Sequence, residues 1–271
     1  SLVEQATAKL VSEGRTSARW FFESRPAEAE ARAVAEVGEV ARRTGTPVYV
    51  VHLSSSAGLE AGRRARKSGA PLLLETCPQY LVLAEGAVSE APERLVCAPP
   101  LRSPPDFQAL LAALATGEID CLATDHCPFS NAQKAVGKDD FRRVPGGLPG
   151  VEHLLPFAYD LALAGRIPFE RLASLVAATP ARLFGLAHCK GRISAGLDAD
   201  FVLLDPQAVT EISPDRMHSR TDWTPYNDFW LRGAVRSVYL RGRRSAASNP
   251  DGRVDPVAPP NGRYLAAKRS P

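Results

Sequence analysis

Two side chains that can bind a metal ion each follow a short apolar run. His52 comes directly after residues 47–51 (PVYVV), and Asp125 comes directly after residues 119–124 (IDCLAT). In a parallel α/β fold the carboxyl ends of the strands meet at one face, where barrel enzymes place their chemistry. A neutral imidazole suits zinc and similar ions, and a carboxylate can both bind a metal and take a proton from an attacking water. The sequence therefore predicts a hydrolytic metal site, although one histidine and one aspartate are too few to hold a catalytic metal.

Each of these residues also has a purely structural interpretation. A histidine after a strand could be buried and bonded to a nearby carbonyl, and Asp125 could cap the next helix. His126 could form a hydrogen bond that orients a metal ligand, although a structural role is favoured for it. Cys127 could line a pocket, but a role as nucleophile is not favoured. The residues alone leave these alternatives open for His52 and Asp125.

The elements that must position these residues begin with a β-α-β unit. Apolar runs over residues 47–52 and 71–76 predict two strands, and a helical pattern over residues 56–67 lies between them. Residues 119–124 predict a third strand. Continuous apolar strands joined by helices are typical of a parallel sheet that is buried on both faces. Further helices are predicted over residues 1–14, 27–43, 106–115, 151–164 and 168–178.

The C-terminal part of the chain has a different character. Strands are predicted over residues 191–193, 200–204 and 234–243. We therefore divide the chain into a hydrolase-barrel portion over residues 1–189, a β-sandwich portion over residues 190–245 and an extended tail over residues 246–271. The long polar stretch 125–150 lies inside the first portion, and a loop of that length is usually functional or disordered.

The composition limits the class of protein. With 271 residues, 45% of them hydrophobic and 23% charged, the chain fits a globular protein of one large domain or a domain with an appendage. Its net charge of +3, without a basic stripe, argues against nucleic acid as a partner. No apolar run approaches the ~20 residues of a membrane span. The five cysteines include no C-x-x-C pair, which argues against a disulfide framework and fits free thiols in the cytoplasm.

Several short segments match, in chain order, the motifs of one enzyme family. Residues 50–55 (VVHLSS) look like its sixth-strand histidine motif, residues 97–102 (CAPPLR) like its proline-rich substrate loop, and residues 123–129 (ATDHCPF) like its eighth-strand aspartate motif. Further matches are residues 132–141 (AQKAVGKDDF), 147–152 (GLPGVE), 190–200 (KGRI to DAD), 218–220 (HSR) and 225–226 (PY). Together these segments resemble the dihydropyrimidinase/hydantoinase branch of the cyclic amidohydrolases, over nearly the whole chain.

The resemblance implies a (β/α)8 TIM barrel with two zinc ions that hydrolyses the ring amide of dihydropyrimidines or hydantoins. It implies that His52 is a ligand of one metal, and that Asp125 is a ligand of the other metal and the general base. Ala98 and Gly146 would bind the small cyclic amide, largely through backbone atoms. The family also implies a cytoplasmic homo-oligomer, a dimer or tetramer.

The chain departs from the family pattern in ways that affect activity. The family's His-x-His pair on strand one, its bridging carboxylated lysine on strand four and its strand-five histidine have no counterpart. We therefore expect the C-terminal portion of such an enzyme, about strands six to eight with their helices plus part of a small β-sandwich, inactive by itself. Ala98 stands where the family commonly has serine, and Gly146 where it commonly has asparagine, which affects the expected substrate preference.

Three alternatives remain from the sequence. An allantoinase or a dihydroorotase would share the chemistry, and residues 75–78 (ETCP) are somewhat allantoinase-like, whereas residues 134–141 favour the dihydropyrimidinase side. A non-catalytic scaffold relative would have kept the barrel and lost the metal. The presence of both His52 and Asp125 argues against the scaffold, because a scaffold needs neither.

Overall fold

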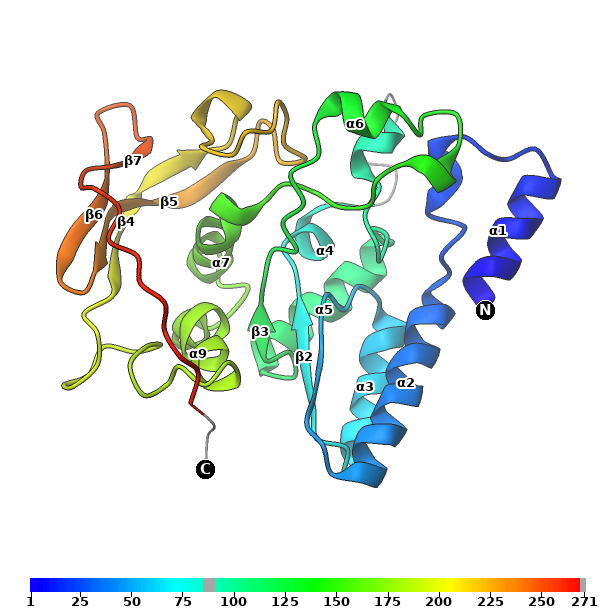
Figure 1. Ribbon diagram of the computed structural model, residues 1–271, viewed down its shortest axis with the longest axis horizontal. Coiled ribbons are helices and arrows are strands. Elements are labelled where there is room, and N and C mark those ends of the chain that lie inside the picture. Colours follow the sequence, from blue (N-terminus) through cyan, green and yellow to red (C-terminus); the bar gives the residue numbers. More distant parts are fainter. Residues whose placement is uncertain (85–90, 269–271) are drawn as a thin grey trace. The chain divides into compact units, whose positions relative to one another are not determined.

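The protein divides into two compact units in a computed structural model that describes residues 1–84 and 91–268 (Figure 1). The first unit comprises Ser1–Val151 and His218–Pro225, and the second comprises Glu152–Met217 and Tyr226–Pro271. These units do not follow the boundaries at residues 189/190 and 245/246 that the sequence suggested, and that division stays a prediction. In the described residues, no helix is both long and apolar enough to cross a bilayer.

A three-stranded parallel sheet lies at the centre of the first unit. It consists of β1 (Val48–Val50), β2 (Leu72–Thr76) and β3 (Cys121–Leu122), in the order β1-β2-β3. Val48 pairs with Leu72, and Glu75 pairs with Cys121. The parallel β-α-β arrangement predicted from the apolar runs is therefore confirmed, and the chain is a mixed α/β protein.

Side-chain carboxylates add to the backbone ladder of this sheet. Next to β3, the carboxylate of Asp120 accepts the N–H of Leu74 at 2.7 Å, while the Asp120 N–H donates to the Leu74 carbonyl at 2.8 Å. Beyond β1, the N–H of His52 donates to the Glu75 carboxylate at 3.1 Å. Backbone bonds continue past both outer strands, since the Leu53 N–H donates to the Glu75 carbonyl at 2.8 Å and the Ala123 N–H donates to the Thr76 carbonyl at 3.0 Å.

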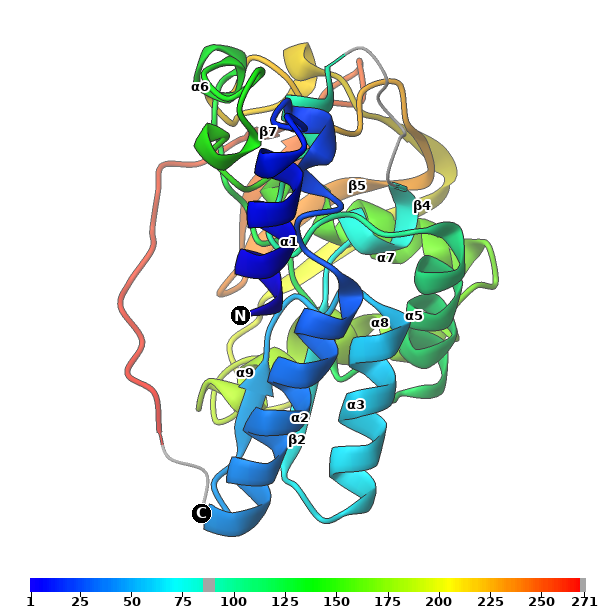
Figure 2. The same ribbon diagram turned by 90° about the vertical axis from the view of Figure 1, so that its right-hand side faces the viewer.

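Two long helices pack together beside the sheet, α2 (Ala27–Thr44) and α3 (Ser56–Lys67) (Figure 2). Their predicted ranges agree with the structure to within one residue at each end. Gly38 on α2 permits the close approach, because a Cβ there would lie only 2.6 Å from the Cβ of Ala65 on α3. Gly62 on α3 similarly faces Leu74 of β2, which is fully buried. A third helix, α5 (Pro104–Thr116), leads into β3.

The polar stretch 125–150 is folded and contains α6 (Asn131–Ala135) and a 3-10 turn (Phe141–Arg143). It bonds to the start of the chain, where Phe141 N–H donates to the Thr16 carbonyl at 2.7 Å and Ala18 N–H donates to the Lys138 carbonyl at 2.9 Å. This segment packs a small core together with the N-terminal α1 (Leu2–Ser12) and a 3-10 turn (Ala18–Phe21). Short helical segments elsewhere in the first unit are α4 (Gln79–Val82) and Pro92–Leu95, and a 3-10 turn (Val151–His153) spans the point where the chain passes to the second unit.

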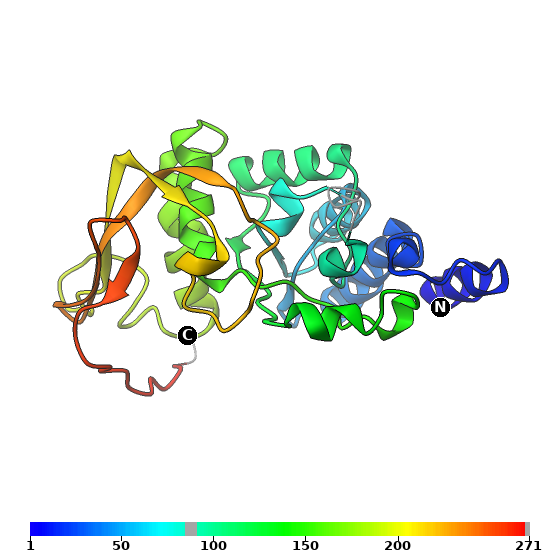
Figure 3. The ribbon, with the colours of Figure 1, turned by 90° about the horizontal axis from the view of Figure 1, so that it is seen from above.

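The second unit combines helices with an antiparallel sheet. Its strands are β4 (Phe201–Glu211), β5 (Trp230–Leu240), β6 (Arg243–Ser248) and β7 (Val254–Pro256), in the order β4-β5-β6-β7. Its helices are α7 (Leu154–Leu163), α8 (Phe169–Ala173), a π-helical turn (Ser174–Ala178), α9 (Thr179–Leu183) and a 3-10 turn (Pro214–Arg216). The orange β5 lies beside α7 (Figure 3), where Asp160 accepts the N–H of Arg232 at 2.8 Å.

The predictions for this sheet were only partly right. The strands expected at residues 200–204 and 234–243 are parts of the longer β4 and β5. The strand expected at residues 191–193 is wrong, since Gly191 has a φ of 96° and the Lys190 ammonium there is paired with Asp198 and Asp200. The expectation of an extended tail from residue 246 is also incomplete, because β6 runs to Ser248 and β7 adds a fourth strand.

Candidate active site

His52 and Asp125 lie at the same end of the parallel sheet. His52 is two residues beyond β1, and Asp125 is three residues beyond β3. The strands are parallel, so these positions share the carboxyl-end edge, with β2 between them. Adjacent strands are about 4.8 Å apart, so the two backbones are separated by roughly 10 Å. His52 and Asp125 thus follow strands at the same end of the sheet, as expected. That they bind metal together stays a proposal.

Both residues have a left-handed backbone. The φ angle of His52 is 42° and that of Asp125 is 49°, and Asp228 and Arg241 are the only other non-glycine residues with positive φ in the described part of the chain. This conformation is uncommon for residues with a side chain and costs on the order of 1 kcal/mol or more. Strained backbone clusters at functional sites, so its presence at these two positions supports a functional role.

Three carboxylates hold the loop that follows β1. The N–H groups of residues 52, 54 and 56 donate, in turn, to carboxylates of β2, α2 and α5. The bonds are His52 N–H to Glu75 at 3.1 Å, Ser54 N–H to Glu30 at 2.8 Å and Ser56 N–H to Asp106 at 2.9 Å. Negative charge at the start of α3 is also favourable to the helix dipole. The backbone that carries His52 is therefore fixed from three sides.

The charge of Asp125 acts on three cysteine side chains, Cys77, Cys97 and Cys127. Burial raises the pKa of Cys77, and nearby charges including Asp125 raise it further. Burial also raises the pKa of Cys97 to about 12, and burial followed by Asp125 raises the pKa of Cys127. A nucleophilic cysteine needs a lowered pKa. The raised pKa of Cys127 therefore argues against a nucleophilic role, and a place for it in the lining of the site stays a prediction.

His126 is held by the turn at the end of the polar segment. Its Nδ1 accepts the N–H of Gly150 at 3.0 Å and the N–H of Val151 at 3.2 Å. Its backbone forms a bridge with Leu148. His126 therefore fixes the turn through the acceptor role of its Nδ1. The structural role favoured for His126 is the one that these contacts support.

The two residues predicted to bind substrate are neighbours. A Cβ on Gly146 would lie 3.7 Å from the Cβ of Ala98. The proline-rich loop (residues 97–102) and the glycine turn (residues 146–150) are therefore in contact. The next residue, Gly147, has a φ of 139°, and a Cβ there would lie 2.3 Å from the Cβ of Cys127. Only glycine fits at this position. The turn is thereby placed against the segment that follows Asp125.

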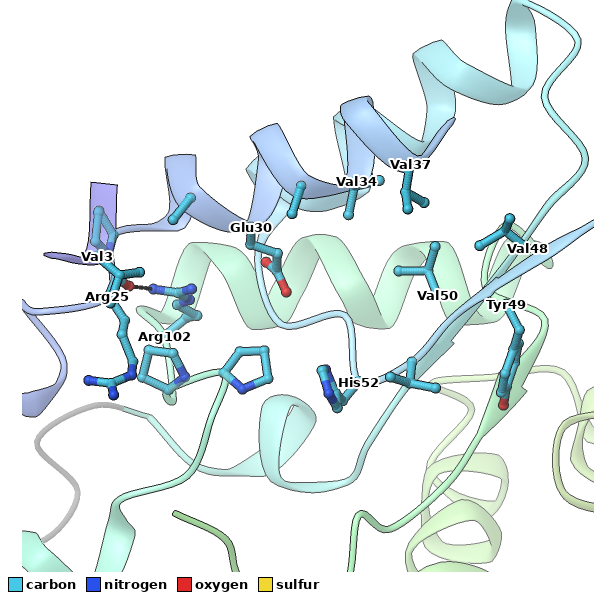
Figure 4. Close-up of a pocket in the computed structure, with 16 residues that line it drawn as sticks. Val3, Arg25, Glu30, Val34, Val37, Val48, Tyr49, Val50, His52 and Arg102 are labelled. Carbon is cyan, nitrogen blue, oxygen red and sulfur yellow. Dashed lines mark hydrogen bonds between the residues drawn. The ribbon is translucent and has the colours of Figure 1, made fainter. Parts of the chain in front are cut away.

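A cavity of about 460 Å³ opens on the outer side of β1, with His52 among its lining residues (Figure 4). Its apolar walls are formed by Val34 and Val37 of α2 and by Val48 and Val50 of β1, which face each other across the space. Glu30, which accepts the N–H of Ser54, also lines it. The side chain of His52 therefore borders an apolar space.

The metal site predicted from the sequence is incomplete within the described residues. In residues 1–84 and 91–268, no group of three or more His, Cys, Asp or Glu side chains could hold a metal ion. A catalytic zinc usually has three protein ligands and one open position. His52 and Asp125 therefore do not make a complete site with the other described side chains.

Comparison with known proteins identifies the family. The sequence model of the amidohydrolase family matches residues 3–246, which is most of the chain. The chain belongs to the amidohydrolase family. Amidohydrolases with solved structures also share its fold. A D-hydantoinase (dihydropyrimidinase) from Thermus sp. is 34% identical with a TM-score of 0.87, and the match covers 90% of this chain and 54% of that one.

Other relatives have names of the same kind. A D-phenylhydantoinase from Escherichia coli O1:K1 / APEC is 40% identical over 239 residues, which is 87% of this chain and 52% of the relative. The dihydropyrimidinase from Brevibacillus agri NCHU1002 is 32% identical with a TM-score of 0.87, and the match covers 90% of this chain and 54% of that one. The expected resemblance to the dihydropyrimidinase/hydantoinase branch is confirmed. This amidohydrolase chain spans about half the length of these relatives.

One buried charged residue is not apparent from the sequence. Lys134 lies on α6 in the polar stretch and is fully buried, with a relative exposure of 0%. A lysine between polar neighbours is normally solvent-exposed. No local pattern in the sequence indicates its burial, because its hydrogen-bond partners are distant carbonyls.

Proposed function

We propose that the protein hydrolyses the ring amide of a small cyclic amide, a hydantoin or a dihydropyrimidine. The observation that carries this proposal is the placement of His52 and Asp125, both with strained backbones, at the carboxyl-end edge of one parallel sheet. The relatives are named for hydantoins or dihydropyrimidines. The alternatives of an allantoinase, a dihydroorotase or a non-catalytic scaffold are not favoured.

The proposed site divides the roles between residues that follow the two outer strands, β1 and β3. His52 would be a ligand of one metal, and Asp125 would be a ligand of the other and the base that takes a proton from the attacking water. The family resemblance implies zinc, two ions per site. Since the described residues do not complete a metal site, we assign no catalytic step to a metal. Ala98 and Gly146 would bind the ring through their backbone groups.

The same proposal covers the organisation of the whole protein. In it, β1, β2 and β3 with their helices are strands six to eight of a (β/α)8 barrel, and residues 190–245 belong to a small β-sandwich. The five cysteines are free, which suits a cytoplasmic protein. A homo-oligomer, dimer or tetramer, is the expected assembly.

The test measures hydrolysis of hydantoin, dihydrouracil and allantoin by the full-length gene product, together with its metal content. Asp125→Asn keeps the shape of the side chain and removes the base, so kcat should fall by about 10²–10⁴-fold. Asp139→Asn is the control, because Asp139 lies in the same polar segment and its side chain is exposed. A near-normal kcat for Asp125→Asn would rule out the assigned role.

A further inference from the structure

Lys134 is a buried cation without a carboxylate partner. Its side chain is among the largest fully buried ones, and it forms no ion pair with any residue that the structure describes. Burying an unpaired charge costs free energy unless hydrogen bonds compensate for the lost water. A lysine at such a position therefore needs a specific reason to be there.

The ammonium group of Lys134 joins two chain segments. Its Nζ donates to the Val96 carbonyl at 2.6 Å and to the Pro145 carbonyl at 2.9 Å. The Val96 carbonyl also accepts the N–H of Gly147 at 3.0 Å. Phe129 adds an aromatic ring 5.8 Å from Nζ. One nitrogen thus connects the proline-rich loop to the glycine turn.

The two anchored carbonyls stand next to the proposed substrate contacts. Val96 is two residues before Ala98, and Pro145 directly precedes Gly146. Ala98 and Gly146 themselves are close, with 3.7 Å between the Ala98 Cβ and an ideal Cβ on Gly146. A lysine has three donors on a single atom, so it can hold two carbonyls at a fixed separation, which an apolar side chain cannot do.

We propose that Lys134 is a positioning residue, whose ammonium sets the spacing between the Ala98 and Gly146 backbones that bind the ring amide. This inference rests on the proposed function, and it adds a residue that does not itself contact the substrate. Misplacing a binding group by about 1 Å can cost on the order of 10²-fold in rate. Loss of the ammonium should therefore affect substrate binding first.

The experiment compares Lys134→Met with Lys138→Met in the full-length gene product. Methionine keeps most of the volume of lysine and removes the donors, and Lys138 is an exposed lysine on the same segment. For Lys134→Met we expect KM for hydantoin or dihydrouracil to rise at least tenfold and kcat to fall less than threefold. Lys138→Met should match the wild type. If Lys134→Met changes KM no more than Lys138→Met, the inference is overturned.

A second variant and a second measurement keep the inference testable if Lys134→Met does not fold. Lys134→Gln keeps an amide donor and should give a KM between those of the wild type and Lys134→Met. Hydrogen exchange at the Gly147 N–H needs no turnover and should be at least tenfold faster in either variant. If the wild type hydrolyses none of the substrates, the proposed function fails, and an unchanged exchange rate in the variants separately overturns the role of Lys134.

Discussion

His52 and Asp125, the two residues proposed to act in hydrolysis, both have a left-handed backbone. Aspartate and histidine both occur in this region more often than most residues with a side chain. At His52 the conformation is held by a hydrogen bond from its N–H to the Glu75 carboxylate. A backbone conformation of this kind is not visible in a sequence, so the sequence suggested these two side chains as candidates without indicating their backbone geometry.

At the same scale, Lys134 should make stability depend on pH. Burial lowers the pKa of Lys134 from its ordinary 10.5 to about 8, so between these values the unfolded chain holds more protons than the folded chain. The free energy of unfolding contributed by Lys134 therefore rises with pH through this window. Relative to Lys134→Met, the wild type should gain about 2–3 kcal/mol between pH 7.5 and 10.5.

Urea unfolding at several pH values measures this difference. Lys138→Met provides the comparison, since it should keep the pH slope of the wild type between pH 7.5 and 10.5. Equal slopes for Lys134→Met and the wild type would show that the buried amine holds its proton as tightly as a free lysine does.

At the scale of elements, the glycine turn contains a matched pair of positions. A Cβ on Gly147 would lie 2.3 Å from the Cβ of Cys127 and would require a φ of 139°, whereas a Cβ on Gly146 meets Ala98 at an ordinary 3.7 Å. Gly147→Ala should therefore destabilise the protein by about 2 kcal/mol or more, and Gly146→Ala should change stability by less than about 1 kcal/mol. Thermal unfolding measures this difference, and Gly147→Ala should have the lower melting temperature. Equal melting temperatures of the two variants would contradict the prediction.

Elements with strong local signals were predictable from the sequence. Helix α3 was placed at residues 56–67 because Ser55 or Ser56 could cap it and Gly69 follows it. Its bounds agree with the structure, in which Ser55 is the cap. Strands β6 and β7 were missed, because Arg243, Arg244 and the small residues after them show no apolar alternation. β6 depends on pairing with β5, and β7 depends on pairing with β6. Lys134 was missed for the same reason, because its role depends on carbonyls distant in the chain.

At the scale of the whole molecule, β1 ends the sheet among the strands of the described residues. Its outer side borders the apolar cavity, and Val50 lines that space. A strand edge flanked by apolar surface is a site for pairing with another chain. The polypeptide of these 271 residues, studied alone, should therefore associate at micromolar concentrations.

Val50→Lys tests this expectation, because a lysine at an edge strand opposes pairing. It should shift the sedimentation profile toward the monomer. Val136→Lys, which removes an exposed valine (57% exposed) on the polar segment, should leave association unchanged. A monodisperse wild-type monomer would contradict the prediction.

The three acids that hold residues 52, 54 and 56 come from β2, α2 and α5, which lie up to fifty residues away along the chain. The backbone that carries His52 can therefore take its final conformation only after all three elements have docked. The geometry of this loop is thus a property of the folded unit and not of the local sequence.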